Sequence, residues 1–222
     1  MTTKCIKLAI DYMKDNKLDK NIFFKELRDI QYKTYLACNR AMTYYYTHDM
    51  QNMIAKENNE VVKKDEEVYG KSFKSYVYNK ISEILGDDIT SYASDCINQF
   101  VFNRYKNDKK QGLFKGNVTL SEFKWDFPVM LRDNSFKIIE PPNGLGIEIQ
   151  FFGRNKLKKM GMTSGEKIKF LFPKIDKGRK ATLINIMSKT YKQGSIQLSY
   201  NKRKKKWMAT ISYTFDSKKE EE

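Results

Sequence analysis

Apolar residues and turn residues divide the chain into a first half that is expected to be helical and a second half rich in strands. From residue 1 to residue 111 there is no proline, and the only glycines are Gly70 and Gly86. All four prolines and the other nine glycines follow from Gly112 onward. Because glycine and proline interrupt helices and mark turns, we expect mostly helices before residue 112 and mostly strands and turns after it.

The longest expected helix spans about residues 22–56 and carries one apolar stripe. Residues of the stripe recur at steps of three and four, the spacing of one helix face. They are Leu27, Ile30, Thr34, Ala37, Cys38, Ala41, Tyr45 and His48. Asp19 stands where an N-cap is expected. A second face carries Arg28, Tyr32, Tyr35, Asn39 and Tyr46. Aromatic rings beside arginine and asparagine suit stacking on bases and riboses, and they suit packing against a neighbouring helix equally well.

Two further helices are expected at about residues 71–85 and from residue 90 or 91 onward. Gly86 would end the first of these as a C-cap. The mixed-charge residues 57–68 favour a solvated connection between the helices. The third helix leads into a basic segment with five cations within twelve positions, which are Arg104, Lys106, Lys109, Lys110 and Lys115. A phosphate backbone could approach this segment at its glycine turn.

The second half shows short strands at about 136–140, 146–152 and 167–172, a short helix near 180–189, and a closing β-hairpin. Two alternating runs, one ending at Tyr200 and one beginning at Trp207, predict this hairpin. The first residues alternate as well, with Ile6, Leu8 and Ile10 on one side. A strand followed by helices and then by many strands predicts an α+β fold. The domains would be a first barrel strand at 1–20, a helical insertion at 21–111 and a β-barrel at 112–222.

The charge of the chain indicates which class of partner it binds. Lysine and arginine number 42 against 27 aspartates and glutamates, a net charge of +15. Such an excess is easiest to understand when a polyanion offsets it, and nucleic acid comes before an anionic membrane. A merely lysine-rich surface is the alternative. The charges cluster, however, and five consecutive cations form the expected hairpin tip: Lys202, Arg203, Lys204, Lys205 and Lys206. Lys174, Lys177, Arg179 and Lys180 would extend this surface on another turn.

The residue types for catalysis or metal binding are largely missing. Cys5, Cys38 and Cys96 are far apart and His48 is the only histidine, so no zinc site at a usual spacing can be assembled. Cys38 is expected to be a buried thiol, and the cysteine usage suits a reducing cytosol. Asp11 ends an apolar strand but has no evident companion carboxylates for two-metal chemistry. No signal peptide or membrane-spanning run is present, and no cofactor motif is complete.

Three stretches together resemble the miniature type V-F CRISPR effectors and their TnpB relatives. "LRDIQYKTYLACNRAMTYYY" (27–46), with its Asn39-Arg40-Ala41 step, is similar to their first recognition-lobe helix. "GLFKGNVTLSEFKWDFPVML" (112–131) is similar to their return from recognition lobe to wedge domain. "KRKKKWMATISYTF" (202–215) is similar to their last wedge hairpin. The resemblance covers nearly the whole chain and implies an OB-like wedge barrel with an inserted helical recognition lobe.

This resemblance implies roles for the candidate residues. The wedge and recognition lobes of the family hold the guide RNA and help to read the DNA motif beside the target. Guide-RNA contacts would therefore come from the hairpin tip, from Lys174, Lys177, Arg179 and Lys180, and from Lys115. DNA contacts would come from Tyr76, Lys80, Ser94, Asn98 and Lys106. The face that carries Arg28, Tyr32, Tyr35 and Asn39 would belong to the recognition helix.

The family continues into a RuvC-like nuclease, whereas this chain stops at "DSKKEEE". The expectation is a guide-RNA- and DNA-binding module without catalytic residues, metal or cofactor, in the cytoplasm. It would work with a RuvC-bearing or full-length effector protomer as a homodimer or heterodimer. Two alternatives stay open: a truncated inhibitor that occupies the guide RNA or the effector's dimer surface, and a generic RNA-binding protein.

Overall fold

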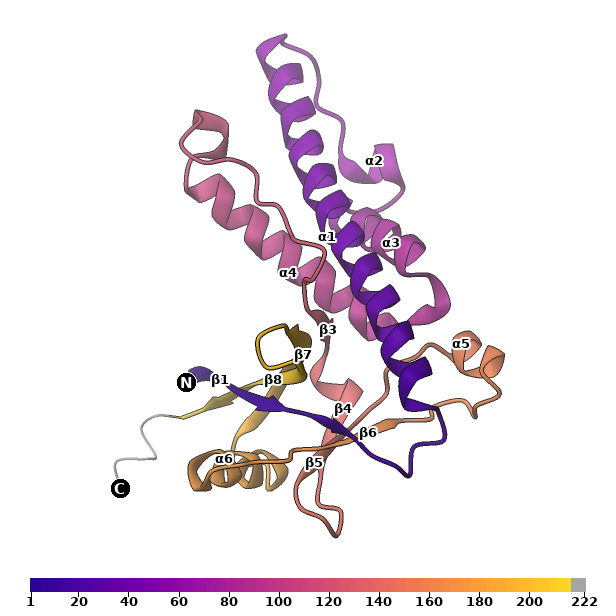
Figure 1. Ribbon diagram of the computed structural model, residues 1–222. Helices are drawn as coiled ribbons and strands as arrows, with labels where there is room; N and C mark the ends of the chain where they lie inside the picture. Colours follow the sequence, from indigo (N-terminus) through magenta and orange to yellow (C-terminus); the bar gives the residue numbers. More distant parts are fainter. Residues whose placement is uncertain (217–222) are drawn as a thin grey trace. The chain divides into compact units, whose positions relative to one another are not determined.

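A computed structural model describes residues 1–216 of the chain (Figure 1). The chain forms two compact units. We call residues 1–29, 87–93 and 128–216 the sheet unit, and residues 30–86 and 94–127 the helical unit. The helical unit thus includes residues 112–127, which the sequence-based division placed with the barrel. Among residues 1–216, no helix is long and apolar enough to cross a bilayer.

The sheet unit contains two antiparallel sheets of four strands each. The first has the order β1-β8-β7-β3 and the second the order β2-β6-β5-β4. Their strands are β1 (Thr2–Ala9), β2 (Asp11–Tyr12), β3 (Val129–Leu131), β4 (Phe136–Ile139), β5 (Gly146–Ile149), β6 (Ile168–Leu171), β7 (Lys192–Asn201) and β8 (Lys206–Phe215). The predicted pairing of the N-terminal strand with a later strand is confirmed, since β1 pairs with β8 along its whole length.

The predicted closed, OB-like barrel is not confirmed. In the described residues the hydrogen-bonded ladders form two separate sheets, and the chain passes directly from one to the other at Ile10. The Ile10 N–H still donates to the Trp207 carbonyl at 3.1 Å, and β2 then pairs with β6. The alternation pattern correctly predicts strands, but it does not reveal where a strand changes partners.

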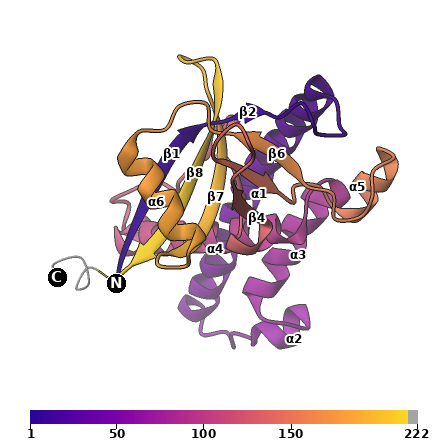
Figure 2. The same ribbon diagram turned by 90° about the horizontal axis from the view of Figure 1, so that it is seen from below.

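Two short helices complete the sheet unit, α5 (Arg154–Lys159) and α6 (Lys177–Met187). Seen from below, α6 lies across the sheet formed by β1, β8 and β7 (Figure 2). It buries Leu183 and Ile186. The core is rich in phenylalanine, and the ring of Phe23 lies 5.5 Å from Phe170 and 5.6 Å from Phe151.

The helical unit is built from helices, as predicted, and all of them except α2 are long. They are α1 (Lys20–Glu57), which begins in the sheet unit, then α2 (Asp65–Tyr69), α3 (Phe73–Leu85) and α4 (Ser91–Lys110). Short 3-10 turns are η1 (Gly86–Asp88), where the chain passes from the helical unit to the sheet unit, η2 (Leu113–Lys115) in the helical unit, and η3 (Asp133–Ser135) in the sheet unit. Asp19 caps α1 by accepting from Asn21 N and Ile22 N. The connection predicted at 57–68 differs, because α2 begins within it at Asp65.

Candidate nucleic-acid interface

The hairpin tip is a tight turn whose cationic side chains all face solvent. Asn201 and Lys206 are the last paired residues of β7 and β8, so residues 202–205 form the loop. The Asn201 side-chain oxygen accepts from Lys204 N at 2.9 Å, and Lys205 adopts a left-handed φ of 50°. All five cations from 202 to 206 are exposed. The predicted hairpin with an exposed cationic tip is therefore confirmed.

The tip forms one wall of a groove that we call the cationic groove. This cavity of about 530 Å³ is lined by Lys7, Ala9, Pro173, Lys174, Arg179, Asn201, Lys204, Lys206 and Met208. Five of these nine residues are cations and none is acidic. The structure thus brings together two segments that the sequence analysis named separately, the hairpin tip and the basic segment after β6.

Strand register explains how the cations meet on one face. Ala9 of β1 lies opposite Met208 of β8, and Lys7 lies opposite Thr210. Side chains two positions apart in a strand share a face, so Lys7 and Lys206 flank the Ala9–Met208 pair on the face that bears the groove. The alternate residues, such as Leu8 and Ala209, are buried in the core. Lys7 was missed as a site residue, although the alternation of the first strand already placed it opposite the buried side.

The start of α6 concentrates positive charge where the helix itself is positive. Lys177, Arg179 and Lys180 lie in its first turn, whereas cations are favoured at the other end of a helix. The N-cap Asp176 accepts from Arg179 N at 2.8 Å, and its other oxygen lies 3.2 Å from the Arg179 guanidinium. One carboxylate therefore faces three cations and a helix N-terminus, so a bound anion would be stabilised here.

The turn predicted to carry Lys174, Lys177, Arg179 and Lys180 is corrected in part. Lys174 lies in the loop after β6, but the other three lie on α6. Of the four, Lys174 and Arg179 line the cationic groove. Lys177 and Lys180 are exposed on the same helix. The helix predicted near 180–189 begins three residues earlier, at Lys177, because Asp176 caps it there, whereas Gly178 weakens the helical pattern before Lys180.

The helical unit uses several predicted DNA-contact residues for its own packing. Asn98 is buried, and its amide accepts from Tyr45 Oη at 2.8 Å and donates to the Lys74 carbonyl at 3.1 Å. Ser94 is buried on the same helix. Neither side chain can reach a ligand without opening the unit. We therefore remove Ser94 and Asn98 from the candidate DNA contacts.

Asn39 on the predicted recognition face also has an internal role. Its amide donates to the Phe123 carbonyl at 3.0 Å and accepts from Phe123 N at 2.9 Å. Residues 119–124 have no regular secondary structure, so their backbone groups need side-chain partners. Tyr32, by contrast, is 53% exposed, and its ring lies 5.7 Å from that of Tyr35. Arg28 belongs to the sheet unit, where its guanidinium lies 5.9 Å from the Tyr200 ring.

The other predicted contacts lie at or near the surface of the helical unit. Tyr76 is half-buried in an aromatic cluster with Tyr69 and Phe73. Lys80 lies 5.6 Å from the Tyr76 ring, and its hydrogen bond to Glu83 is the largest cause that raises the pKa of its ammonium. Lys106 and Lys115 are exposed. These four residues are spread over α3, α4 and η2.

Cys38 and Asp11, which the sequence raised as possible reactive or metal-binding residues, have no catalytic surroundings among the described residues. Cys38 is buried as predicted, and burial, with a smaller effect of Cys96, raises the pKa of its thiol. Asp11 lies on β2 with its carboxylate 4.0 Å from the Lys206 ammonium. Within residues 1–216, no three His, Cys, Asp or Glu side chains gather in a way that could hold a metal ion.

Comparison with solved structures finds a likeness in fold. The chain superposes on a chain from the cryo-EM structure of a Cas12f1–sgRNA–target DNA complex with a TM-score of 0.58 and 15% sequence identity. The match covers 96% of this chain and 58% of the Cas12f1 chain. The fold is Cas12f1-like. No protein-family model matches the sequence, and no curated protein matches it either.

Because the identity is low, the likeness establishes the fold and leaves the residue roles to the geometry described above. The chain spans somewhat more than half the length of the Cas12f1 chain it matches. The resemblance seen in the sequence is therefore supported at the level of a Cas12-like fold. Its finer division into a wedge domain and a recognition lobe stays a prediction.

Proposed function

We propose that this chain is an RNA-guided DNA-binding module and that its cationic groove holds phosphates of the guide RNA. The observation that carries the proposal is the groove itself, in which five cations from four separate segments face one cavity without an acidic lining residue. Neutralising phosphates with such residues supplies most of the affinity for nucleic acid. The arrangement favours a backbone contact, by which folded RNA is recognised through its shape.

The unfavourable charges at the start of α6 support the same proposal. Lys177, Arg179 and Lys180 oppose the helix dipole, which costs stability in the free protein. A phosphate bound near these residues would reverse the sign of that interaction. The Cas12f1 structure with a similar fold contains sgRNA and target DNA. This likeness favours guide RNA and target DNA as the partners here.

Target DNA is the second part of the proposal. Tyr76 and Lys80 share one face of α3 one helical turn apart, and Lys106 is exposed on α4. We propose that these side chains contribute DNA contacts once the guide RNA is bound. We further propose that the chain itself does not cut DNA and works with a nuclease-bearing or full-length effector protomer.

The test of the groove is the salt dependence of RNA binding. The variant Lys7→Gln/Lys174→Gln/Arg179→Gln/Lys204→Gln removes four groove cations. The matched control Lys14→Gln/Arg154→Gln/Lys158→Gln/Lys159→Gln removes three lysines and one arginine from exposed positions of the same unit outside the groove. For the wild type, log affinity for a folded hairpin RNA should fall against log salt with a slope of roughly −3 to −4.

The groove variant should flatten this slope by about 3, because each lost phosphate contact removes about 0.7 to 0.9 of the slope. The control should keep most of it. Equal flattening in both variants would show that only total charge matters, and the groove assignment would be wrong. Melting curves of both variants would confirm that each is folded.

A further inference from the structure

A second cavity lies at the other end of α6. It has a volume of about 530 Å³ and is lined by Lys137, Ile138, Ile186, Met187, Lys189, Tyr191, Lys192 and Gln193. We call it the α6 pocket. All of its lining residues belong to the sheet unit. The volume falls within the range of about 300 to 1,000 Å³ that is common for small-ligand sites.

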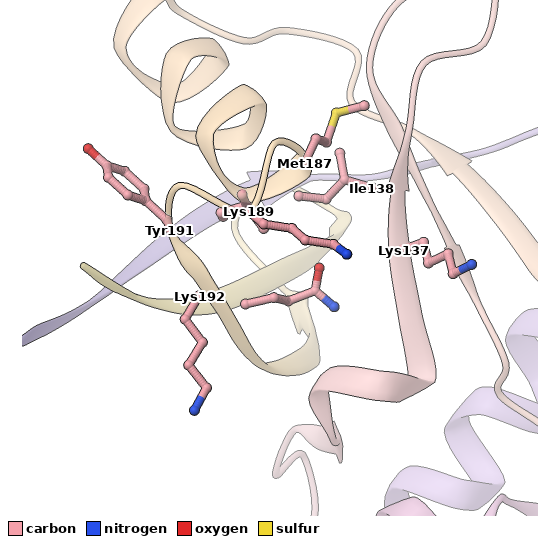
Figure 3. Close-up of a pocket in the computed structure, with 8 residues that line it drawn as sticks. Lys137, Ile138, Met187, Lys189, Tyr191 and Lys192 are labelled. Atoms are coloured by element: carbon pink, nitrogen blue, oxygen red, sulfur yellow. The ribbon is translucent and has the colours of Figure 1, made fainter. Parts of the chain in front are cut away.

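The α6 pocket combines apolar walls with positive charge. Ile138, Ile186 and Met187 supply the walls, and three lysines supply the charge without any acidic lining residue. Figure 3 shows Met187 and Ile138 side by side, with the Lys189 side chain extending past them toward the strand that carries Lys137. Tyr191 and Lys192 lie on the other side of Lys189 and point outward (Figure 3). A ligand that fits this lining has a flat apolar part and an anionic part.

Gln193 gives the pocket a fixed hydrogen-bond acceptor. Its Nε2 group donates to the Asp133 carbonyl at 2.6 Å and to the Phe136 carbonyl at 3.0 Å. A side-chain amide has two N–H donors, so both are used here. The side chain can therefore offer a ligand only its Oε1 atom, which accepts from an N–H group. Nucleobases carry such N–H groups on their edges.

The backbone around the pocket is held in place before any ligand arrives. Lys189 adopts a left-handed φ of 64°, which is uncommon for a residue other than glycine. Its N–H donates to the Ile186 carbonyl at 3.1 Å, and Tyr191 N donates to the Asn185 carbonyl at 2.9 Å. The Tyr191 ring stacks on Tyr213 with the centroids 5.4 Å apart. These contacts fix the turn that presents Lys189 and Lys192.

We propose that the α6 pocket binds an unpaired nucleotide, with its base against the Ile138–Met187 wall and its phosphate at the lysines. The inference rests on the proposed function in one respect, because the nucleotide would belong to the RNA whose phosphates occupy the cationic groove. Arg179 and Met187 are eight residues apart on α6, a rise of about 12 Å, so one bound strand can reach both sites. An acidic peptide is the rival occupant, and its backbone N–H groups also suit the Gln193 acceptor, but its carboxylates give no reason for the apolar wall.

Calorimetric titration with mononucleotides tests the proposal on the whole chain. The probes are AMP, CMP, GMP and UMP, with adenosine and inorganic phosphate as the two halves of AMP and tetraglutamate as the rival. At least one mononucleotide should bind more tightly than either half. Lys189→Gln/Lys192→Gln should weaken that binding at least about tenfold, because one charged contact and a neighbouring positive charge are lost. Lys158→Gln/Lys159→Gln, a charge-matched control on α5, should change it less than about twofold.

Met187→Glu provides a second variant at a site that is 39% exposed and therefore tolerant of change. It should abolish binding by placing a negative charge at the wall. The proposal is overturned if no mononucleotide binds, if phosphate alone binds as tightly as every mononucleotide, or if tetraglutamate binds instead and responds to the same variants.

The same titration separates this inference from the proposed function. The groove variant should keep mononucleotide binding, since Lys7, Lys174, Arg179 and Lys204 do not line the α6 pocket. If the groove variant keeps the full salt slope for RNA while the pocket variants lose the mononucleotide, the groove assignment fails alone. If the slope flattens but no mononucleotide binds, the pocket proposal fails alone.

Discussion

Several polar side chains of the helical unit are buried, whereas the cations of the sheet unit's cationic groove face solvent. Five of the seven buried polar residues among the described residues belong to the helical unit: Gln31, Thr34, Ser94, Asn98 and Asp108. Four of them bond backbone or side chains of their own unit at 2.8 to 3.1 Å. In the sheet unit the core is apolar, and the lysines of the groove remain exposed.

The contrast has a physical cause, which is an irregular segment of the helical unit. The irregular segment that runs from residue 119 to residue 124 and on to Asp126 lies in the helical unit and has no ladder to satisfy its backbone. Gln31 donates to the Asp126 carbonyl, and Asp108 accepts from Ser121 N and Oγ. Strands of the sheet unit satisfy one another's backbone. Outward side chains such as Lys7 therefore do not have to bond backbone groups, and a binding surface can develop on them.

The largest expected effect tests the apolar core of the sheet unit. Trp207 is buried between Phe24, whose ring stacks at 5.9 Å, and Tyr200, at 5.6 Å. Trp207→Ala should lower the free energy of unfolding by about 3 to 5 kcal/mol, measured by urea denaturation. The other tryptophan, Trp125 of the helical unit, is 59% exposed, and Trp125→Ala should cost less than about 1 kcal/mol. If both variants lost the same unfolding free energy, the assignment of Trp207 to the core and of Trp125 to the surface would be wrong.

The next effect tests whether Asn98 is a structural residue. Asn98→Ala leaves the buried Tyr45 hydroxyl and the Lys74 carbonyl without their partner, so the unfolding free energy should fall by about 2 to 3 kcal/mol. Asn107→Ala, at an exposed position of the same helix, should change it by less than about 0.5 kcal/mol. If Asn98→Ala is as stable as Asn107→Ala but loses DNA binding, the original assignment of Asn98 as a DNA contact would be restored.

A smaller effect on stability tests which residues of the predicted recognition face serve packing. Asn39→Ala removes both hydrogen bonds to Phe123 and should cost about 1 to 2 kcal/mol in thermal or urea unfolding. Tyr32→Ala, at an exposed position seven residues earlier on α1, should cost less than about 1 kcal/mol. If Tyr32→Ala weakens RNA binding while stability is kept, the face is shared between packing at Asn39 and binding at Tyr32.

Much of the fold could be predicted from the sequence, because periodicity reports which side of an element is buried. The long helix, the helix ending at Gly86 and the hairpin at 192–215 follow from it. The split into two sheets could not be predicted, since the change of partner at Ile10 depends on contacts far along the chain. The basic residues of the hairpin tip and of 174–180 were found, but their meeting with Lys7 depends on the register of β1 against β8.

The ligand contacts predicted for asparagine and serine on the helices could not be established from the sequence. Asparagine and serine on a helix look alike in sequence whether they bind a ligand or an irregular segment of the same chain. Asn39 and Asn98 satisfy their own unit, and nothing in the spacing distinguishes this use. Lysine is different, because its ammonium is seldom fully buried. A cluster of lysines is therefore expected at the protein surface in any fold.

The smallest effect concerns Tyr12, which lies on β2 at the edge of the second sheet. Its hydroxyl donates to the Leu18 carbonyl at 2.8 Å, and burial, with a smaller contribution from Asp19, raises the pKa of Tyr12 from 10.0 to about 12. The neutral form is thus favoured in the folded state. The unfolded chain releases this proton first, so the stability due to Tyr12 is fully present below pH 10 and is lost as the pH rises through about 12. At neutral pH, Tyr12→Phe should cost about 1 kcal/mol through the lost hydrogen bond.

The measurement is the difference in unfolding free energy between wild type and Tyr12→Phe across this alkaline range, which cancels the titration of the other tyrosines. The difference should shrink as the pH rises above 10, because only the wild type has Tyr12 to deprotonate. A difference that stays constant to pH 12 would mean that the Tyr12 hydroxyl is no better shielded from water in the fold than in the unfolded chain. In that case the packing of Tyr12 against Phe23, at a centroid distance of 5.3 Å, would not exclude solvent, and the sheet unit's core would end before β2.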